Sequence, residues 1–193
     1  NILDFENLTK DNIHVLESPI LSNSQFEKFI EFFKDNLKIL DCTFDVQSNL
    51  KKRLDQLCSE AENAVREGCK HLILSDKKIS EKKAAIPTTL VFGAINSKLV
   101  NLGIRGFVSI NVQTGEVLDT HSFAVLLGVG ATTINPYLVF DSIYQRYEKK
   151  LFGKFSYKEC IQRYIKSVDN GLLKIMSKMG ISVLSAYRGG CNF

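Results

Sequence analysis

Apolar and polar positions follow two alternating patterns along most of this chain: short β-branched runs, then longer segments with helical spacing. The clearest example lies between residues 104 and 138. A β-branched and aromatic run over 107–112 predicts a strand, and an apolar run over 120–127 predicts a helix. A second short strand is expected over 131–134. Because strand and helix alternate with short connections, the pattern indicates a parallel sheet, and this mostly apolar helix should be buried in its core.

Helix starts and stops in this region carry their own signals. Asp119 or Thr120 is suited to cap the apolar helix. Asn135 is expected to cap the next helix, with Pro136 at its first helical position, where the missing N–H costs nothing. Gly128-Val-Gly130 matches only a fragment of the glycine pattern of a phosphate-binding loop. It lies at a helix end, however, where no free N–H groups are offered to a phosphate.

The same alternation extends along the chain and gives four strand–helix pairs, at about 38–67, 71–102, 107–128 and 131–147. The first strand is expected to continue unbroken to residue 46, and residues 77–84 are expected to form a charged loop. Ser18-Pro19-Ile20-Leu21 should be extended, since proline disfavours helix at the residue before it. We therefore predict an α/β fold: a four-stranded, mostly parallel sheet of repeated strand–helix units flanked by helices, like an incomplete (β/α) barrel.

The domain organisation is predicted in three parts. Residues 1–147 are interpreted as a central α/β domain, 148–156 as a linker, and 157–193 as a helix followed by a strand. The helix carries more apolar side chains than one neighbour can cover. The strand is expected over 181–185, with no helix after it, so its edge should be open. We therefore expect this last segment to depend on domains absent from the sequence, to favour dimerisation, and to come from a longer chain.

Composition and charge exclude several classes of function. A chain of 193 residues with 45% hydrophobic residues can bury one well-packed core. No apolar run is long enough to cross a bilayer, and the first residues show no signal-peptide pattern. The net charge of +4 includes lysine pairs in separate segments, interleaved with acids. That pattern is typical of solvated helix faces and argues against a nucleic-acid interface.

The five cysteines, at positions 42, 58, 69, 160 and 191, are odd in number and widely spaced. No pair has C-x-x-C spacing, so the sequence indicates neither a zinc site nor a disulfide framework. We expect buried or unreactive thiols in a reducing compartment.

Few residues suggest chemistry. Asp41 and Asp45 lie four apart on the first predicted strand, so they share a face and could serve acid–base catalysis. Asp45 is also placed to cap the next helix, and no nucleophile or metal ligand accompanies the pair, so a structural role is favoured. Two alternative functions stay open. One is a free-standing (β/α) enzyme for a phosphorylated small molecule, using Ser75-Asp76 and Asn135 at strand ends. The other is a non-catalytic interaction module.

A set of segments in register carries a family resemblance. They are Ser18-Pro-Ile-Leu, Leu40-Asp-Cys-Thr-Phe-Asp45, Glu60-Ala-Glu-Asn-Ala-Val with Gly68, Leu72-Ile-Leu-Ser-Asp76, Gly103-Ile-Arg, His121 with Phe123-Ala124, Gly130-Ala and Asn135-Pro-Tyr-Leu. Together they resemble the central domain of the glutamate synthase large chain. Residues 171–182 with Tyr187-Arg-Gly resemble the lead-in to that family's flavin domain. The chain departs from the family at residues 95–98 and at Ser122, where histidines are common.

The resemblance implies a multidomain iron–sulfur flavoenzyme that makes glutamate from glutamine and 2-oxoglutarate by reduction. An amidotransferase domain would release ammonia, which would travel through a tunnel to an FMN domain. The central domain would connect the two and contribute to the tunnel wall. Ser18, Thr43, Ile134 and Asn135 are our candidates for lining that tunnel, because small polar and aliphatic side chains at strand ends suit ammonia.

No catalytic, cofactor-binding or metal-binding residue of that machinery is expected in this sequence. Position 1 is Asn, where the amidotransferase has a nucleophilic Cys, and the cysteines are too far apart for an iron–sulfur cluster. FMN and the cluster would belong to the parent enzyme, and this segment alone is predicted to be inactive. Its partners would be the neighbouring amidotransferase and FMN domains, with no nucleic acid and no membrane. The expected compartment is the cytoplasm or the plastid stroma, and the electron donor, ferredoxin or a pyridine nucleotide, stays open.

Overall fold

A computed structural model describes residues 16–190, and its central feature is a four-stranded sheet with strand order β1-β3-β5-β6. All three strand pairs are parallel. The strands are β1 (Leu37–Asp41), β3 (His71–Ser75), β5 (Ser109–Gln113) and β6 (Ile134–Asn135). Each is followed by a helix, and the sheet stays open. The predicted α/β fold with four strand–helix units is therefore confirmed.

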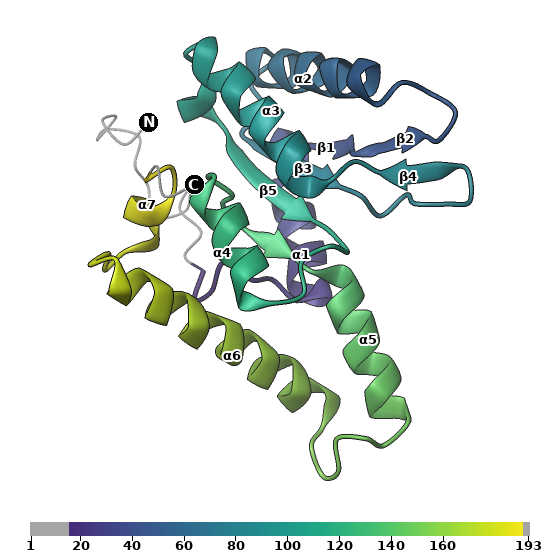
Figure 1. The fold of residues 1–193 in the computed structure, drawn as a ribbon, viewed down its shortest axis with the longest axis vertical. Helices are drawn as coiled ribbons and strands as arrows, with labels where there is room; N and C mark the ends of the chain where they lie inside the picture. The colour runs from purple at the N-terminus through teal and green to yellow at the C-terminus, as the bar shows by residue number, and fades with distance from the viewer. Residues whose placement is uncertain (1–15, 191–193) are drawn as a thin grey trace.

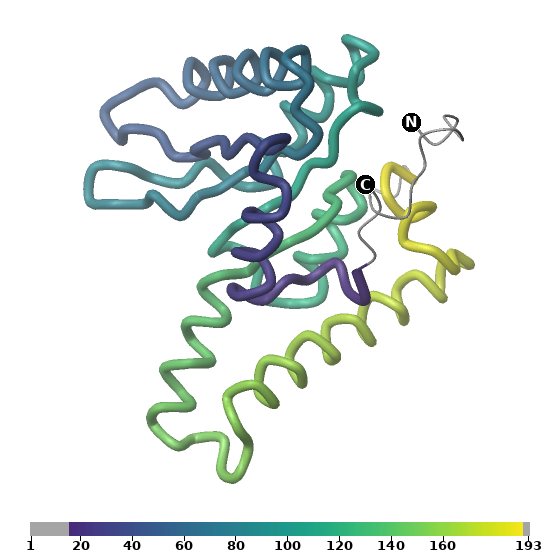
Figure 2. Tube along the Cα trace, turned by 180° about the vertical axis from the view of Figure 1, so that it is seen from behind, coloured from purple at the N-terminus to yellow at the C-terminus, as the bar shows by residue number. Residues whose placement is uncertain are grey.

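Helices cover the two faces of the sheet unequally (Figures 1 and 2). The larger core lies under α2 (Leu50–Arg66), α3 (Thr88–Asn101) and α4 (Thr120–Gly128). The other face is covered by α1 (Asn23–Phe33), whose Phe26 and Phe29 pack on Ile73. Because side chains alternate along a strand, Leu72 and Leu74 point into the larger core while Ile73 points to α1. Two short 3₁₀ helices, η2 (Lys34–Asn36) and η3 (Arg105–Phe107), precede β1 and β5.

Helix α4 lies at the centre of the larger core. Its N-cap is Asp119, whose carboxylate accepts a hydrogen bond from the Ser122 backbone N–H at 2.9 Å. Phe123, Leu126 and Leu127 are buried in the cluster that also contains residues of β5 and β6. The predicted cap and the predicted burial of this helix are both confirmed.

The edge of the sheet beside β6 is covered by the extended segment that precedes α1. Ile20 bridges to Ile134 in parallel. The Ile134 N–H donates to the Pro19 carbonyl at 2.8 Å, and the Leu21 N–H donates to the Ile134 carbonyl at 2.9 Å. The extended conformation expected for residues 18–21 is thus confirmed, and its role is to pair with the last strand.

The predicted cap of α5 (Tyr137–Glu148) is wrong. Asn135 belongs to β6, and Pro136 occupies the cap position without a side-chain hydrogen bond. The Asn135 amide is used elsewhere, because it donates to the Leu21 carbonyl at 2.9 Å and to Asn23 Oδ1 at 3.0 Å. Tertiary pairing with the segment before α1 therefore replaces the local cap.

The single strand predicted over 38–46 is also wrong. The chain turns at Cys42, where the Asp41 carboxylate accepts hydrogen bonds from both the backbone N–H and the hydroxyl of Thr43. Beyond the turn, β2 (Thr43–Asp45) pairs in antiparallel fashion with β4 (Lys83–Ala85). This two-stranded ribbon projects from the carboxyl ends of β1 and β3 (Figure 1), so part of the charged loop expected over 77–84 is a strand.

Helix α6 (Tyr157–Lys178) runs back along α5 and α4 after the connection at residues 149–156. Val168, Leu172 and Met176 of this helix join the larger core. Its close approach to α4 depends on Gly171, because a Cβ there would lie 2.5 Å from Thr120 Cγ2. The helix predicted between 157 and 180 is confirmed, and its buried face packs on the sheet domain.

The strand predicted over 181–185 is wrong. Gly180 adopts a left-handed φ of 69°, and the Ile181 N–H returns to the Met176 carbonyl, which ends α6. A helical turn, α7 (Leu184–Tyr187), follows and places the Tyr187 ring in the core. A strand here would have no place on the β6 edge, which residues 19–21 already occupy. The open strand edge used to predict dimerisation is therefore absent from residues 181–185. The predictions that concern residues 1–15 and 191–193 lie outside the described residues.

Candidate functional site

Polar side chains gather at the carboxyl ends of three neighbouring strands. Ser75, Gln113 and Asn135 stand side by side in the sheet register. The Ser75 hydroxyl donates to Gln113 Oε1 at 2.8 Å, and Gln113 Nε2 donates to Asn135 Oδ1 at 3.2 Å. The three side chains thus form one hydrogen-bonded row across the sheet.

Asp76, directly after β3, is the buried carboxylate of this edge, with 2% of its surface exposed. It accepts a hydrogen bond of 2.6 Å from the Thr114 hydroxyl and one of 3.1 Å from the Gly115 N–H. Burial raises the pKa of Asp76, and hydrogen bonds with Thr114, Gly115 and Tyr137 oppose that rise. Asp76 forms no ion pair with a cation among residues 16–190. The carboxylate is therefore held by neutral donors.

The same network ties the loop after β5 to the start of α3. The Thr88 and Thr114 hydroxyl oxygens are 2.8 Å apart, and the Thr88 N–H donates to Glu116 Oε2 at 2.7 Å. Glu116 therefore satisfies one of the free N–H groups at the start of α3. The polar groups at the carboxyl ends of β3, β5 and β6 thus satisfy one another.

Asp41, the last residue of β1, and Thr43, just beyond it, lie at the other end of the carboxyl edge. Thr43 is buried, and its hydroxyl donates to Asp41 Oδ1 at 2.7 Å. Burial acts to raise the pKa of Asp41, but the hydrogen bonds from Thr43 and the charges of Lys78 and Lys83 hold it below its usual value. Asp45 is engaged separately, because it accepts from the Gln47 N–H at 2.9 Å. The two carboxylates lie in different sheets, and the cap of α2 is Asn49.

The four predicted tunnel residues lie in two places. Ile134 and Asn135 are fully buried in β6, and Ser18 lies in the segment that pairs with β6. The Ser18 hydroxyl donates to Asp169 Oδ1 of α6 at 2.8 Å. Thr43 lies beyond β1, at the opposite edge of the sheet. The structure therefore brings three of the four to one edge and leaves Thr43 apart.

A pocket of about 630 Å³ opens at the amino end of β6, and the sequence-based reasoning did not identify it as a site. Four separate stretches surround it, which are the segment 16–19, the residues Thr132 and Thr133 before β6, helix α6 and the segment 182–188. Its charged and exposed lining residues include Asp169, Leu173, Leu184, Arg188, Lys166 and Glu17. The one available signal was Tyr187-Arg-Gly, which the sequence offered only as part of a family resemblance.

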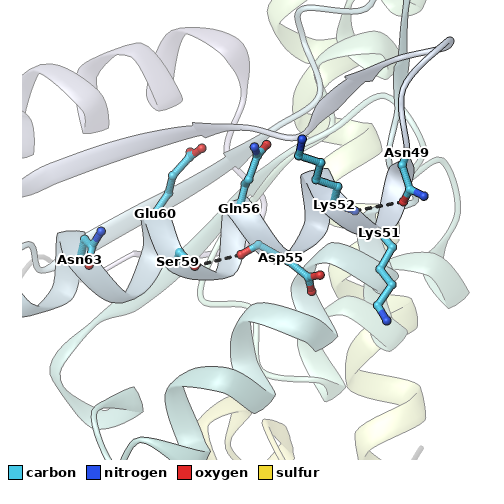
Figure 3. Close-up of a pocket in the computed structure, with 8 residues that line it drawn as sticks. All are labelled: Asn49, Lys51, Lys52, Asp55, Gln56, Ser59, Glu60 and Asn63. Atoms are coloured by element: carbon cyan, nitrogen blue, oxygen red, sulfur yellow. Dashed lines mark hydrogen bonds between the residues drawn. The ribbon is translucent and has the colours of Figure 1, made fainter.

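A larger hollow, of about 830 Å³, runs along α2 (Figure 3). Its side chains all come from this helix and its cap, with Lys52, Gln56 and Glu60 on one side in Figure 3. The dashed contacts there are local: the Lys52 N–H donates to Asn49 Oδ1, and the Ser59 hydroxyl donates to the Asp55 carbonyl. One exposed helix face does not make a concave site.

The described cysteines 42, 58, 69 and 160 are free thiols. Burial raises the pKa of the Cys42 thiol to about 12, which keeps it protonated at neutral pH. Within residues 16–190, no group of three or more His, Cys, Asp or Glu side chains is arranged to hold a metal ion, so these residues do not fit an iron–sulfur cluster. No helix in this range is long and apolar enough to cross a membrane.

Comparison with known proteins gives a consistent result. The glutamate synthase central domain family matches residues 1–193. The NADPH glutamate synthase large chain of Azospirillum brasilense is 45% identical over 196 residues, which cover 100% of this chain and 13% of that protein. The Bacillus subtilis NADPH enzyme large chain is 38% identical, covering 90% of this chain and 11% of the relative.

The name of a plant relative specifies ferredoxin, whereas the names of the two bacterial relatives specify NADPH. The chloroplastic ferredoxin-dependent glutamate synthase of Oryza sativa subsp. japonica is 38% identical over 204 residues, covering 98% of this chain and 13% of the relative. This chain therefore spans roughly an eighth of the length of the curated relatives it matches. The resemblance of the motifs is thus confirmed along the whole sequence, and this chain belongs to the glutamate synthase central domain family.

Proposed function

We propose that this chain is the connecting part of a glutamate synthase large chain, between a glutamine amidotransferase domain and an FMN domain. The parent enzyme would form glutamate from glutamine and 2-oxoglutarate with reduction. The observation that carries this proposal is the match of the central domain family to residues 1–193, together with relatives about eight times as long. FMN and an iron–sulfur cluster would be held by other parts of that larger chain, in a reducing compartment.

The pairing of polar groups at the carboxyl edge supports a connecting role over a catalytic one. In open α/β sheets, ligands usually bind outside the carboxyl ends of the strands. Here the polar atoms of Ser75, Asp76, Gln113 and Asn135 bond to one another, to the side chains of Thr114 and Asn23, or to the backbone. These are the residues that a free-standing enzyme for a phosphorylated ligand would have used. No observation favours that alternative.

We also propose that this domain contributes to the wall of an ammonia passage. Ser18 is the best placed of the four predicted residues, because it is half-buried and lies at the pocket beside β6. Thr43 lies at the opposite edge of the sheet from Ser18, so it would line the passage only if the passage followed the β1 edge. Ile134 and Asn135 contribute by fixing the segment that carries Ser18.

The experiment uses the large chain that contains this sequence. Ser18→Leu and Thr43→Leu add bulk at the two edges, and Ser167→Leu on the exposed side of α6 is the matched control. We measure glutamate formed per glutamine hydrolysed, together with free ammonium. The variant that narrows the passage should lower this ratio and release ammonium, whereas the control should not.

The two variants also decide which edge the passage follows. An unchanged ratio in both would show that neither residue lines it, while the family assignment would stand. A large chain that makes no glutamate from glutamine even in its unchanged form would overturn the proposed function itself.

A further inference from the structure

Arg188 lies in an unusual position for a guanidinium group. It follows α7 and lines the pocket beside β6. Its Nε is buried and has no hydrogen-bond partner, and its Nη2 lies 3.5 Å from the Thr132 carbonyl, at the outer limit for a hydrogen bond. Arg188 forms no ion pair with a carboxylate among residues 16–190. Burial alone lowers its pKa, with no opposing contribution from an acid.

The neighbouring Arg105 shows how a partly buried guanidinium is usually satisfied. Its Nε donates to Asn96 Oδ1 at 2.7 Å, its Nη1 to the Val108 carbonyl at 2.7 Å, and its Nη2 to the Gly130 carbonyl at 3.0 Å. Burial lowers the pKa of Arg105, and the charge of Arg188 lowers it further. The two cations are therefore close enough to repel each other, and only one of them has a full set of acceptors.

The acids that line the pocket do not neutralise Arg188. Asp169 accepts its hydrogen bond from Ser18, and burial raises its pKa. Glu17 lines the pocket without pairing with Arg188. Arg188 is half-buried, and a guanidinium partly withdrawn from water destabilises a fold unless an anion or a set of acceptors is supplied. The missing group is thus an anion from outside the described residues.

The remaining walls indicate what carries that anion. Leu172 and Met176 form a buried apolar floor, and Leu184 lies beside them. Leu173 lines the same pocket with 59% of its surface exposed. An apolar wall beside a cation suits a peptide segment that presents a carboxylate next to an apolar side chain. An inorganic anion would use only the guanidinium and leave the leucines uncovered.

We propose that this pocket receives an aspartate or glutamate side chain from the part of the large chain that lies outside residues 1–193, and that Arg188 binds its carboxylate through two parallel N–H···O hydrogen bonds. Planar guanidinium and carboxylate groups match in this geometry. The inference rests on the proposed function, since it requires a larger chain, and relatives of this sequence are about eight times as long.

The test is photo-cross-linking in the intact large chain. p-Benzoylphenylalanine replaces Leu173 in the pocket, and the matched control carries it at Lys174, the next residue of α6, which does not line the pocket. Cross-linked peptides are identified by mass spectrometry in a mixture of ¹⁴N- and ¹⁵N-labelled chains. The Leu173 position should capture a peptide of the same chain, outside residues 1–193, that contains Asp or Glu. The Lys174 position should not capture that peptide.

Substitution of Arg188 then tests the carboxylate contact. Arg188→Ala should lower the yield of this cross-link by about fivefold or more, and Arg188→Lys should lower it less, because lysine keeps the charge without the planar fork. A cross-link that maps within residues 1–193, that joins chains of different isotope label, or that persists in Arg188→Ala would overturn the inference. The readout does not depend on ammonia transfer, so it can fail while the proposed function holds.

Discussion

The two ends of the parallel strands contrast in how their polar groups are satisfied. At the carboxyl ends, Ser75, Gln113 and Asn135 bond to one another, and Asp76 is held by neutral donors. At the amino end of β6, the buried Nε of Arg188 has no partner within residues 16–190. At the end that usually binds ligands in open α/β sheets, the polar groups of β3, β5 and β6 are paired, whereas the buried Nε of Arg188, at the opposite end, is unsatisfied.

The contrast follows from which segments build each end. The carboxyl edge is made by consecutive strand–helix units, so each strand end lies beside the next along the sheet. The pocket is made by segments 16–19, 132–133, 166–176 and 182–188, which are far apart in the sequence. The polar groups at the carboxyl ends of β3, β5 and β6 thus pair locally, whereas within residues 16–190 the pocket leaves the Nε of Arg188 without a partner.

The largest expected effect comes from truncating a side chain in the hydrophobic core that lies between the two ends of the strands. Leu126→Ala removes a buried side chain between α4 and the strands, and it should lower the free energy of unfolding by about 2–5 kcal/mol. Urea denaturation measures the change. Leu118→Ala is the control, because Leu118 is 59% exposed and should change stability by less than about 0.5 kcal/mol. A loss for Leu126→Ala as small as for the control would place α4 outside the core.

An effect of intermediate size is expected as a difference in the free energy of unfolding between variants of the two neighbouring arginines, Arg105 and Arg188. Arg105→Met leaves three acceptors without their donor and should lower the free energy of unfolding by about 1.5–3 kcal/mol. Arg188→Met removes a half-buried charge whose Nε has no hydrogen-bond partner within residues 16–190, so its effect in this chain should stay within about 0.5 kcal/mol. Both values come from urea denaturation. Equal losses would mean that Arg188 already has a partner, and the contrast between the two ends would disappear.

The smallest expected effect is a pH dependence at the carboxyl edge. Burial raises the pKa of Asp76 above 3.8, so its contribution to stability is fully present below pH 3.8 and is lost as the pH rises through the raised pKa. Asp76→Asn removes that titration. The free energy of unfolding of the variant, relative to the unchanged chain, should therefore rise between pH 4 and neutral pH.

Asp41→Asn is the matched control for this pH series. Hydrogen bonds from Thr43 and the charges of Lys78 and Lys83, which outweigh burial, lower the pKa of Asp41. The contribution of the Asp41 carboxylate to stability is present above pH 3.8 and is lost as the pH falls. The free energy of unfolding of Asp41→Asn, relative to the unchanged chain, should therefore fall as the pH rises. Slopes of the same sign for the two variants would refute the different environments assigned to these carboxylates.

Sequence periodicity was sufficient for the four strand–helix units, because each combines a short β-branched run with a helix of clear spacing. It failed where long-range contacts decide the local structure. Residues 181–185 are rich in β-branched side chains, yet the sheet edge beside β6 is occupied, and Tyr187 is buried through a helical turn. Asn135 is a residue type that commonly caps helices, but here its side-chain amide donates to the Leu21 carbonyl instead.

The candidate site could be predicted only in part. Ser75-Asp76 and Asn135 were identified at strand ends, since the carboxyl ends of parallel strands follow directly from the strand assignments. The pocket at Arg188 could not be found this way, because its walls come from four distant segments. That the Nε of Arg188 has no partner within residues 16–190 follows from the tertiary structure and has no local sequence signal.

The pairing of residues 19–21 with β6 has a consequence for self-association. Within residues 16–190, it leaves β1 as the one edge at which the main sheet could accept another strand. An exposed edge of this kind favours aggregation unless it is protected. Here Arg53 of α2 donates to the carbonyl groups of Asp41 and Thr43, at 2.7 and 3.4 Å, where β1 gives way to β2. The charged side chain thus occupies the acceptor at the carboxyl end of β1, which an incoming strand would otherwise use.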